Sequence, residues 1–284
     1  MIITGTTRLL GIIGDPVGHS RSPQMQNRAL VEAGLEWVYL PFHVLPERLE
    51  AAVAGLRALE IHGFNVTVPH KVAIVPLLDR LSPEAAEIGA VNTVLNDNGT
   101  LVGHNTDGFG LIASLEQDAG FDPHGGELVV VGAGGAARAA VHALCGAGAA
   151  RVVIVNRTVG RASDLAEQYG ARFPEVRIEV RPTLPSSLAR YDLLLNTTSV
   201  GMDGSSLAAD PATLGSSAVV YDMVYSPSES PLLAAARLMG LRRANGLGML
   251  AAQGERAFTL WTGLTPPQGL MKAVLQDTVL GSRF

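Results

Sequence analysis

Cysteine is nearly absent from this sequence, and charged residues are scarce. Cys145 is the single cysteine among 284 residues, which excludes an intramolecular disulfide and indicates a reducing compartment. Charged residues make up only 17% of the chain and the formal net charge is −5, so the basic surface that nucleic-acid binding requires is missing. We therefore predict neither a disulfide-stabilised fold nor a nucleic-acid partner.

The sequence also lacks a long uninterrupted apolar run. The N-terminus, Met1-Ile2-Ile3-Thr4-Gly5, has no basic segment followed by an apolar stretch, the pattern of a secretory signal. The most apolar region, residues 128–155, is interrupted by Arg138, His142 and several glycines, which is typical of a buried α/β core rather than a membrane span. We expect a cytoplasmic protein with no membrane partner.

Apolar residues, by contrast, are abundant. They make up 47% of the chain, a composition that suits parallel sheets covered by helices on both faces. The length favours roughly two domains, each with a core of its own. The fold class that we predict is therefore α/β, with two α/β domains.

One stretch predicts a dinucleotide-binding domain of the Rossmann type. The apolar strand Glu127–Val131 leads into Gly132-Ala133-Gly134-Gly135-Ala136-Ala137, then into a helix to about residue 145 and a second strand, Arg151–Val155. In this order, Gly132 permits a tight turn, Gly134 lets a pyrophosphate approach the backbone, and the helix N-terminus attracts the phosphates. The alternative is a glycine-rich turn in an unrelated domain, which the complete β-α-β unit disfavours.

The end of the second strand predicts which dinucleotide binds. An acid at this position accepts a hydrogen bond from the ribose of NAD, but the chain continues Asn156-Arg157-Thr158-Val159-Gly160-Arg161 and has no acid here. Arg157 and Arg161 can grip a 2′-phosphate from two sides, with Asn156 and Thr158 as further donors. The alternative is that Arg161 pairs with Asp164 on a solvated helix face. We predict NADP as the cofactor and no metal site.

Polar side chains follow the predicted strands of the N-terminal half. On the strand that begins at Gly63, alternation places Asn65 and Thr67 on one face, at the end where α/β folds bind ligands. Ser22 before Pro23 is typical of a helix N-cap, although the hydroxyls of Ser20 and Ser22 together also suit a bound carboxylate. The sequence leaves both alternatives open.

Lys71 and Asp107 are candidate chemical groups. We predict a helix that begins at Pro69, which places Lys71 in its first turn, where the helix dipole disfavours a cation and makes it easier to deprotonate. The alternative for Lys71 is an ordinary solvated charge. Asp107 opens another predicted helix and could simply be its N-cap or first-turn acid.

The other elements complete an α/β pattern. Asn98-Gly99 predicts a hairpin between two short strands, at 90–94 and 100–103. Further strands are expected at 37–43, 191–196 and 218–222. Helices are expected to begin near 23, 46, 83, 107, 231, 249 and 268.

Eight segments in register resemble one family, the shikimate dehydrogenases. They are His19-Ser20-Arg21-Ser22-Pro23, Asn65-Val66-Thr67-Val68-Pro69-His70-Lys71, Gly89-Ala90-Val91-Asn92-Thr93, Asn105-Thr106-Asp107-Gly108, Gly132-Ala133-Gly134-Gly135-Ala136, Asn156-Arg157-Thr158, Tyr221-Asp222-Met223-Val224-Tyr225, and Asn245-Gly246-Leu247-Gly248-Met249-Leu250 with Gln253. The resemblance implies reversible NADPH-dependent reduction of 3-dehydroshikimate to shikimate, on the pathway to chorismate and the aromatic amino acids.

The same resemblance implies a role for individual residues. Lys71 and Asp107 would be the catalytic pair. The substrate would be lined by Ser20, Ser22, Asn65, Thr67, Asn92, Tyr225 and Gln253. The cofactor would be held by Gly132, Ala133, Gly134, Gly135, Ala136, Asn156, Arg157, Thr158, Arg161, Met223 and Gly246.

Two departures from the family pattern, Gln26 and Ser230, bear on fine substrate preference rather than on the catalytic pair. Two alternatives remain: a quinate/shikimate dehydrogenase with relaxed cofactor use, and a non-catalytic NADP-binding paralogue. We expect a substrate-binding catalytic domain at 1–106, an NADP-binding Rossmann domain at 107–242, and C-terminal helices at 243–284 that return to the first domain. The small-molecule substrate is then the main partner, and a homodimer remains open.

Overall fold

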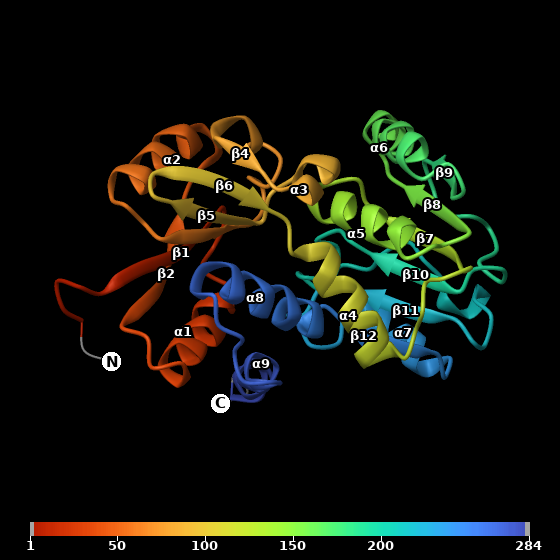
Figure 1. Ribbon diagram of the computed structural model, residues 1–284. Helices are drawn as coiled ribbons and strands as arrows, with labels where there is room; N and C mark the ends of the chain where they lie inside the picture. Colours follow the sequence, from red (N-terminus) through yellow and green to blue (C-terminus); the bar gives the residue numbers. More distant parts are fainter. Residues whose placement is uncertain (1–2, 282–284) are drawn as a thin grey trace. The chain divides into compact units, whose positions relative to one another are not determined.

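The computed structural model describes residues 3–281 (Figure 1). Contacts divide the chain into two compact units, the first containing residues up to Asp107 and from Leu250 onward, the second Gly108–Met249. The sequence placed the second boundary at residue 242, whereas β12 (Arg242–Asn245) and the start of α8 (Leu247–Thr262) extend the second unit to Met249. Within residues 3–281, no helix is long and apolar enough to span a membrane.

The first unit contains a mixed sheet of six strands in the order β2-β1-β3-β5-β6-β4. The strands are β1 (Arg8–Gly14), β2 (Trp37–His43), β3 (Gly63–Val66), β4 (Arg80–Leu81), β5 (Thr93–Asp97) and β6 (Thr100–His104). β1 pairs in parallel with β2 and β3, whereas β5 is antiparallel to both β3 and β6. The predicted hairpin joins β5 to β6, and Asn98 and Gly99 both have positive φ, 51° and 90°, as its tight turn requires.

Helices pack around this sheet. They are α1 (Ser22–Glu32), α2 (Leu49–Ala58) after the short helix η1 (Pro46–Arg48), α3 (Pro83–Ile88), most of α8, and α9 (Leu270–Gly281). The apolar face predicted for α2 is confirmed, because Leu49, Val53 and Leu56 are buried in one core with Phe64 of β3. α1 also packs against α9, so the two ends of the chain contribute to the same unit.

The second unit has the doubly wound architecture predicted for a dinucleotide-binding domain. Its six strands are all parallel, in the order β12-β11-β10-β7-β8-β9. They are β7 (Glu127–Val131), β8 (Arg151–Val155), β9 (Arg177–Arg181), β10 (Leu193–Asn196), β11 (Val219–Asp222) and β12. The strand order reverses between β7 and β10, and such a switch point is where doubly wound folds bind ligands.

Helices cover both faces of this second sheet, and Figure 1 shows α5 and α6 beside β7 and β8. They are α4 (Asp107–Ala119), α5 (Gly135–Gly146), α6 (Val159–Arg172) and α7 (Pro231–Leu238). On β7, Leu128 and Val130 belong to one apolar core, whereas Val129 and Val131 belong to the core of the opposite face. A strand buried on both faces explains why its sequence is continuously apolar.

One prediction for the first unit is wrong. Pro69 does not begin a helix: residues 69–74 form turns, and only the short helix η2 (Val75–Leu77) follows. The Lys71 carbonyl accepts the N–H of Val91 instead of that of Val75, which bonds to Val72, so the helical ladder is not made. No helix dipole therefore acts on Lys71 from a helix beginning at Pro69.

Ser22 is not a helix cap. The cap position of α1 is Arg21, which has helical backbone angles and makes no side-chain capping bond. Ser22 is instead the first residue of the helix and is buried. Pro23 is thus one position further into the helix than predicted, where its missing N–H still costs nothing.

Candidate active site

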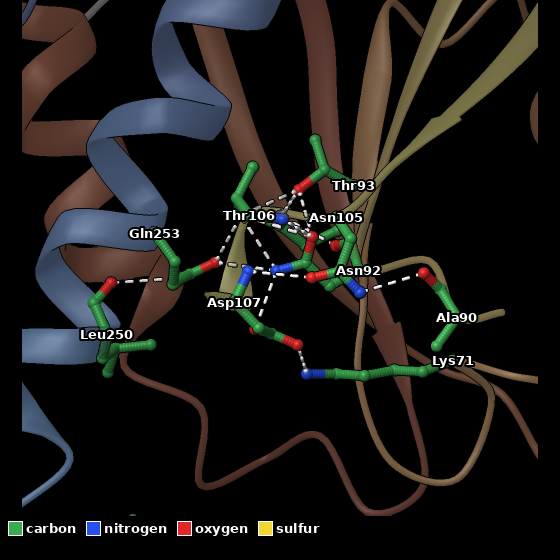
Figure 2. Close-up of polar contacts among 10 residues, drawn as sticks. Lys71, Ala90, Asn92, Thr93, Asn105, Thr106, Asp107, Leu250 and Gln253 are labelled. Carbon is green, nitrogen blue, oxygen red and sulfur yellow. Dashed lines mark hydrogen bonds and ion pairs between the residues drawn. The ribbon is translucent and has the colours of Figure 1, made fainter. Parts of the chain in front are cut away.

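Lys71 and Asp107 form an ion pair in the first unit (Figure 2). The lysine lies in the turns after β3, and the aspartate is the first residue of α4. Lys71 Nζ lies 2.6 Å from Asp107 Oδ2, and the two side chains are 15% and 6% exposed. A short charge-assisted bond so little exposed to water is stronger and better oriented than a surface ion pair.

Asn92 fixes the other oxygen of the Asp107 carboxylate. Its Nδ2 donates to Asp107 Oδ1 at 2.8 Å and to Thr106 Oγ1 at 2.9 Å, while its Oδ1 accepts the backbone N–H of Thr106 at 2.8 Å. Both carboxylate oxygens of Asp107 are therefore held, one by a cation and one by an amide. The carboxylate has little freedom to rotate.

Asn105 holds the backbone at the same place. Its Oδ1 accepts the N–H of Asp107 at 3.0 Å, and its Nδ2 donates to the Ala90 carbonyl at 2.9 Å. The first N–H group of α4 is thus satisfied by an asparagine two residues earlier. Asp107 is the first residue of α4, so of the two alternatives the first-turn acid is the one observed, and the N-cap is not.

Gln253 of α8 joins this cluster from the C-terminal part of the first unit. Its Oε1 accepts from Asn92 Nδ2 at 3.3 Å and from Thr106 Oγ1 at 3.4 Å, and its Nε2 donates to the Leu250 carbonyl at 2.8 Å. Figure 2 shows Gln253 and Lys71 on opposite sides of Asp107 and Asn92. The structure thus brings together four of the residues expected in the site, Lys71, Asn92, Asp107 and Gln253.

Thr67 lies just beyond β3 with its methyl group against the backbone of Gly14. A Cβ added to Gly14 would come within 2.4 Å of Thr67 Cγ2, so only glycine permits this contact. The Thr67 hydroxyl has no hydrogen-bond partner among residues 3–281. Its O–H is consequently available to a ligand.

The two serines before α1 are linked to each other. Ser20 is half-buried, and its Oγ accepts the backbone N–H of Ser22 at 3.3 Å. Ser22 is buried and forms a hydrogen bond with the Tyr39 phenol.

Asn65 is more enclosed than a ligand-contacting residue usually is. It is 4% exposed, its Nδ2 donates to the Asn92 carbonyl and to Thr93 Oγ1, both at 3.0 Å, and its Oδ1 accepts from the Tyr39 hydroxyl at 2.7 Å. Both N–H groups of the side chain are therefore used inside the protein.

Tyr39, Thr93, Asn105 and Thr106 all bond to the residues described above, although the sequence predicted no individual role for them. An asparagine two residues before a helix start is a recognisable signal for Asn105. No comparable signal marks Tyr39 or Thr93, which are 0% exposed and appear in the sequence as ordinary strand residues.

In the second unit, the glycine-rich turn leaves the N-terminus of α5 open. Gly132 has φ 120°, and a Cβ there would come within 2.3 Å of Thr197 Oγ1. Gly134 is the cap residue of α5 and makes no side-chain capping bond, while a Cβ at this position would meet nothing within 4 Å. The Gly132 N–H donates to the Val155 carbonyl at 2.9 Å, so the backbone N–H groups offered to a ligand are those that follow it, next to the open space at Gly134. This is the arrangement that receives a phosphate.

The segment after β8 carries the two arginines of the predicted phosphate site. Arg157, Thr158 and Arg161 are exposed, and Asn156 Nδ2 donates to the Thr158 carbonyl at 2.8 Å. Within the described residues, neither arginine makes an ion pair, so the alternative pairing of Arg161 with Asp164 is absent. The guanidinium groups remain available to an anion.

Met223 and Gly246 lie at the ends of neighbouring strands, β11 and β12. A Cβ on Gly246 would come within 2.1 Å of the Met223 carbonyl oxygen, so this close approach requires glycine. Tyr225 follows Met223 in the same loop of the second unit.

Buried Asp222 organises the loop that carries Met223 and Tyr225. Its Oδ1 accepts from Val224 N at 3.0 Å and Asn196 Nδ2 at 2.9 Å, and its Oδ2 accepts from Ser230 Oγ at 2.5 Å. Burial raises the pKa of this carboxyl, although the three donors lower it in part. Among the described residues, no group of His, Cys, Asp and Glu could hold a metal ion.

Comparison with known proteins identifies the family. Residues 12–94 match the shikimate dehydrogenase substrate binding domain, residues 116–202 match shikimate / quinate 5-dehydrogenase, and residues 246–276 match the shikimate 5′-dehydrogenase C-terminal domain. The shikimate dehydrogenase (NADP(+)) of Geobacter sulfurreducens is 54% identical over 285 residues, covering 99% of this chain and 100% of that protein. The chain belongs to the shikimate dehydrogenase family.

Solved structures agree with this assignment. The shikimate 5-dehydrogenase of Thermus thermophilus, in complex with NADP(H) and shikimate, has a TM-score of 0.85 at 38% identity, covering 95% of this chain and 99% of that one. A quinate dehydrogenase of Corynebacterium glutamicum, in complex with NAD, has a TM-score of 0.87 at 32% identity, covering 95% and 99%. The mixed α/β architecture predicted from the sequence is thereby confirmed.

Proposed function

We propose that this protein catalyses the reversible, NADP-dependent interconversion of 3-dehydroshikimate and shikimate, on the route to chorismate and the aromatic amino acids. The observation that carries the proposal is the Lys71–Asp107 pair, 2.6 Å apart and little exposed to water, with Asn92 on the second carboxylate oxygen. A lysine held by a carboxylate in a polar, partly enclosed cluster suits proton transfer to and from an alcohol.

Lys71 is the group that moves the proton. Oxidation of a secondary alcohol removes a hydride from carbon and a proton from oxygen, and Nζ of Lys71 takes the proton from the hydroxyl. In the reverse direction the ammonium returns it to the oxygen of the ketone. General acid–base catalysis of this kind typically contributes about 10²–10⁴ to the rate.

Asp107 and Asn92 set the geometry of this transfer. Asp107 Oδ2 holds Nζ of Lys71, and Asn92 prevents the carboxylate from turning away. A second function for both is to bind hydroxyl groups of the substrate. Hydrogen bonds to individual hydroxyls discriminate among polyhydroxylated rings better than an apolar pocket does.

The remaining substrate contacts are proposed from position. Ser20 and Ser22 lie at the N-terminus of α1 and Thr67 lies at the end of β3, and their hydroxyls suit the carboxylate of the substrate. Gln253 reaches the cluster through Asn92, and we propose Tyr225 as a further contact from the second unit. Asn65, which the sequence also placed in this set, lies at the buried side of the cluster, with its amide hydrogens bonded to the protein.

The second unit fits NADP, which supplies the hydride acceptor when bound. We propose that the turn Gly132–Ala136 holds the pyrophosphate at the open N-terminus of α5. Asn156, Arg157, Thr158 and Arg161 take the 2′-phosphate, while Met223 and Gly246 flank the cofactor at the ends of β11 and β12. The missing acid after β8 favours NADP over NAD.

These assignments give each unit a role. Residues up to Asp107 together with the C-terminal helices form the substrate-binding unit, and Gly108–Met249 form the cofactor-binding unit. The single buried cysteine supports a reducing compartment, the cytoplasm, for this reaction.

A rate measurement tests the proposal. The purified protein is assayed at the absorbance of reduced nicotinamide with shikimate and with quinate, each with NADP and with NAD. We expect the largest kcat/KM for shikimate with NADP. Preference for quinate with NAD would favour the quinate dehydrogenase alternative, and NADPH binding without turnover would favour the non-catalytic one.

A further inference from the structure

A row of buried polar side chains lies beneath the Lys71–Asp107 pair. Tyr39 and Thr93 are 0% exposed, Asn92 is 2% exposed and Asn65 is 4% exposed. Register places Asn65 opposite Thr93 across β3 and β5, and Tyr39 reaches Asn65 from β2. A polar group buried this deeply costs free energy unless it is hydrogen-bonded. Each donor of the row can therefore be assigned to one acceptor.

The orientation of the Asn92 amide follows from a backbone donor. The N–H of Thr106 lies 2.8 Å from one atom of the amide, which must therefore be the oxygen. The nitrogen then faces the Asp107 carboxylate at 2.8 Å. Asn92 donates to Asp107 only in this orientation.

The orientation of the Asn65 amide follows from a backbone acceptor. The side-chain nitrogen of Asn65 lies 3.0 Å from the backbone carbonyl oxygen of Asn92, which can only accept a hydrogen bond. The side-chain oxygen of Asn65 therefore faces Tyr39. The Tyr39 hydroxyl must then be the donor of the 2.7 Å bond. Burial keeps this phenol protonated by raising its pKa well above the ordinary value.

Thr93 connects the two amides. Its Oγ1 accepts the second N–H of Asn65 at 3.0 Å, which leaves its own proton for Asn92 Oδ1, also at 3.0 Å. The donors therefore point in one direction, from Tyr39 through Asn65, Thr93 and Asn92 to Asp107. Hydrogen bonds aligned in this way polarise and strengthen one another.

We propose that Tyr39, Asn65 and Thr93 are positioning residues that hold Asn92, and through it Asp107, in the orientation the reaction requires. The inference rests on the proposed function, because it names the interior support of that same site. It also changes the role expected for Asn65. With both N–H groups engaged inside the protein, Asn65 acts through Asn92 and not by donating to the substrate.

Tyr39→Phe tests the inference, with Tyr221→Phe as the matched control. Tyr221 is also 0% exposed and donates a single hydrogen bond to a neutral oxygen, Ser114 Oγ at 2.8 Å, but it lies in the second unit, outside this row. Both changes remove one buried phenol hydroxyl, so both are expected to lower the unfolding temperature similarly. Only Tyr39→Phe is expected to lower kcat with shikimate, by roughly tenfold, with KM for NADP unchanged. Tyr39 also bonds Ser22, and the loss of that bond is read separately, as a rise in KM for shikimate.

A second pair of variants keeps the test informative if Tyr39→Phe does not fold. Thr93→Val removes the proton that Asn92 Oδ1 receives, whereas Thr93→Ser retains it. We expect a kcat loss of roughly tenfold in Thr93→Val and recovery to near the wild-type value in Thr93→Ser. If Thr93 had only a structural role, the two substitutions would lower the stability of the protein without this difference in kcat.

The wild-type rate with shikimate decides the proposed function, and the ratio of each variant to wild type decides this inference. A wild-type protein that turns over shikimate, combined with a Tyr39→Phe or Thr93→Val variant of unchanged kcat, would overturn the positioning role and leave the proposed function intact. Equal kcat losses in Tyr39→Phe and Tyr221→Phe would overturn it as well.

Discussion

The two candidate sites of this protein differ in how their polar groups are used. In the first unit, the carboxylate of Asp107 has protein partners on both oxygens, and its backbone N–H is bonded too. In the second unit, the N-terminus of α5 has no capping side chain, and within residues 3–281 Arg157 and Arg161 have no ion-pair partner. The carboxylate of the first site thus has its hydrogen bonds within the protein, whereas the second site has donors that are available to a ligand.

This difference matches two kinds of task. Proton transfer requires groups fixed before the reaction, because reorganising them during the reaction raises the barrier. Recognition of a large anion requires donors that the protein does not already use, because each would otherwise have to be released first. Removing one group should therefore impair chemistry in the first unit and cofactor binding in the second.

Lys71→Ala is expected to have the largest effect of these variants, and the effect falls on kcat. Loss of the proton-transferring amine should lower kcat by about 10²–10⁴, the usual worth of general acid–base catalysis. NADPH affinity, measured by fluorescence titration, should stay within about twofold, since the residue belongs to the substrate-binding unit. Turnover near the wild-type rate in Lys71→Ala would exclude it as the proton carrier.

Removing both arginines tests the cofactor side. A hydrogen bond to a charged group is worth about 1.5–3 kcal/mol, so two independent ones amount to about 3–6 kcal/mol, or roughly 10²–10⁴ in affinity. Because Arg157 and Arg161 are exposed and would share one phosphate, we expect the lower end, about 10², for NADPH in the double Ala variant.

The control for this prediction is NADH, which has no phosphate at that position. Its kcat/KM should change by less than about threefold, so that the preference for NADPH over NADH collapses. If the double variant loses affinity for both cofactors equally, the arginines do not recognise the 2′-phosphate.

Much of this fold could be predicted because local pattern and tertiary environment agree. β7 and β8 are buried on both faces and are continuously apolar in sequence, and the apolar positions of α2 repeat at helical spacing. β9 and β12 were missed, because both are edge strands with the polar sequences Arg-Ile-Glu-Val-Arg and Arg-Arg-Ala-Asn. On β9, Ile178 and Val180 alternate with charged residues and pack against the core, a short strand signal that was overlooked. β12 has no such alternation, and its strand conformation comes from pairing with β11.

The errors near the site have a similar origin. Pro69 is a good first helical residue, but the Lys71 carbonyl is used by Val91, a residue far along the chain. Tyr39 and Thr93 could not be recognised either, since their roles depend on which strands are neighbours in the sheet. Motif residues were accessible from the sequence, whereas Tyr39 and Thr93, which support them from neighbouring strands, were not.

A substitution of Thr67 is expected to have a smaller effect, on the KM for shikimate. It is the one residue of the proposed substrate set in the first unit whose hydroxyl is not engaged by the described protein, so it resembles the arginines more than Asp107. Thr67→Val deletes the hydroxyl and keeps the methyl that packs on Gly14, and should raise KM for shikimate by about tenfold with a smaller change in kcat.

Thr67→Ser is the matched variant, since it retains the hydroxyl and loses the methyl. Its KM should stay within about threefold of wild type. A rise in KM for Thr67→Ser as large as that for Thr67→Val would show that the packing contact with Gly14 matters and the hydroxyl does not.

Treatment of the folded protein with an alkylating reagent is expected to have the smallest effect, because Cys145 should not react and both sites should stay unchanged. Cys145 lies in α5 and is 1% exposed, and burial, assisted by Glu175, raises the pKa of its thiol to about 12. Only the thiolate reacts with iodoacetamide, and at pH 8 its fraction is about 10⁻⁴, against about one quarter for a free cysteine. Because the pKa is raised, this fraction grows tenfold with each pH unit and still reaches only about 10⁻³ at pH 9.

We therefore expect no labelling of Cys145 by mass spectrometry and full activity after the folded protein is treated for an hour. Rapid labelling is expected once urea unfolds it. Labelling of the folded protein together with loss of NADPH binding would instead mean that α5 opens locally, and that the turn before it is less rigid than its packing implies.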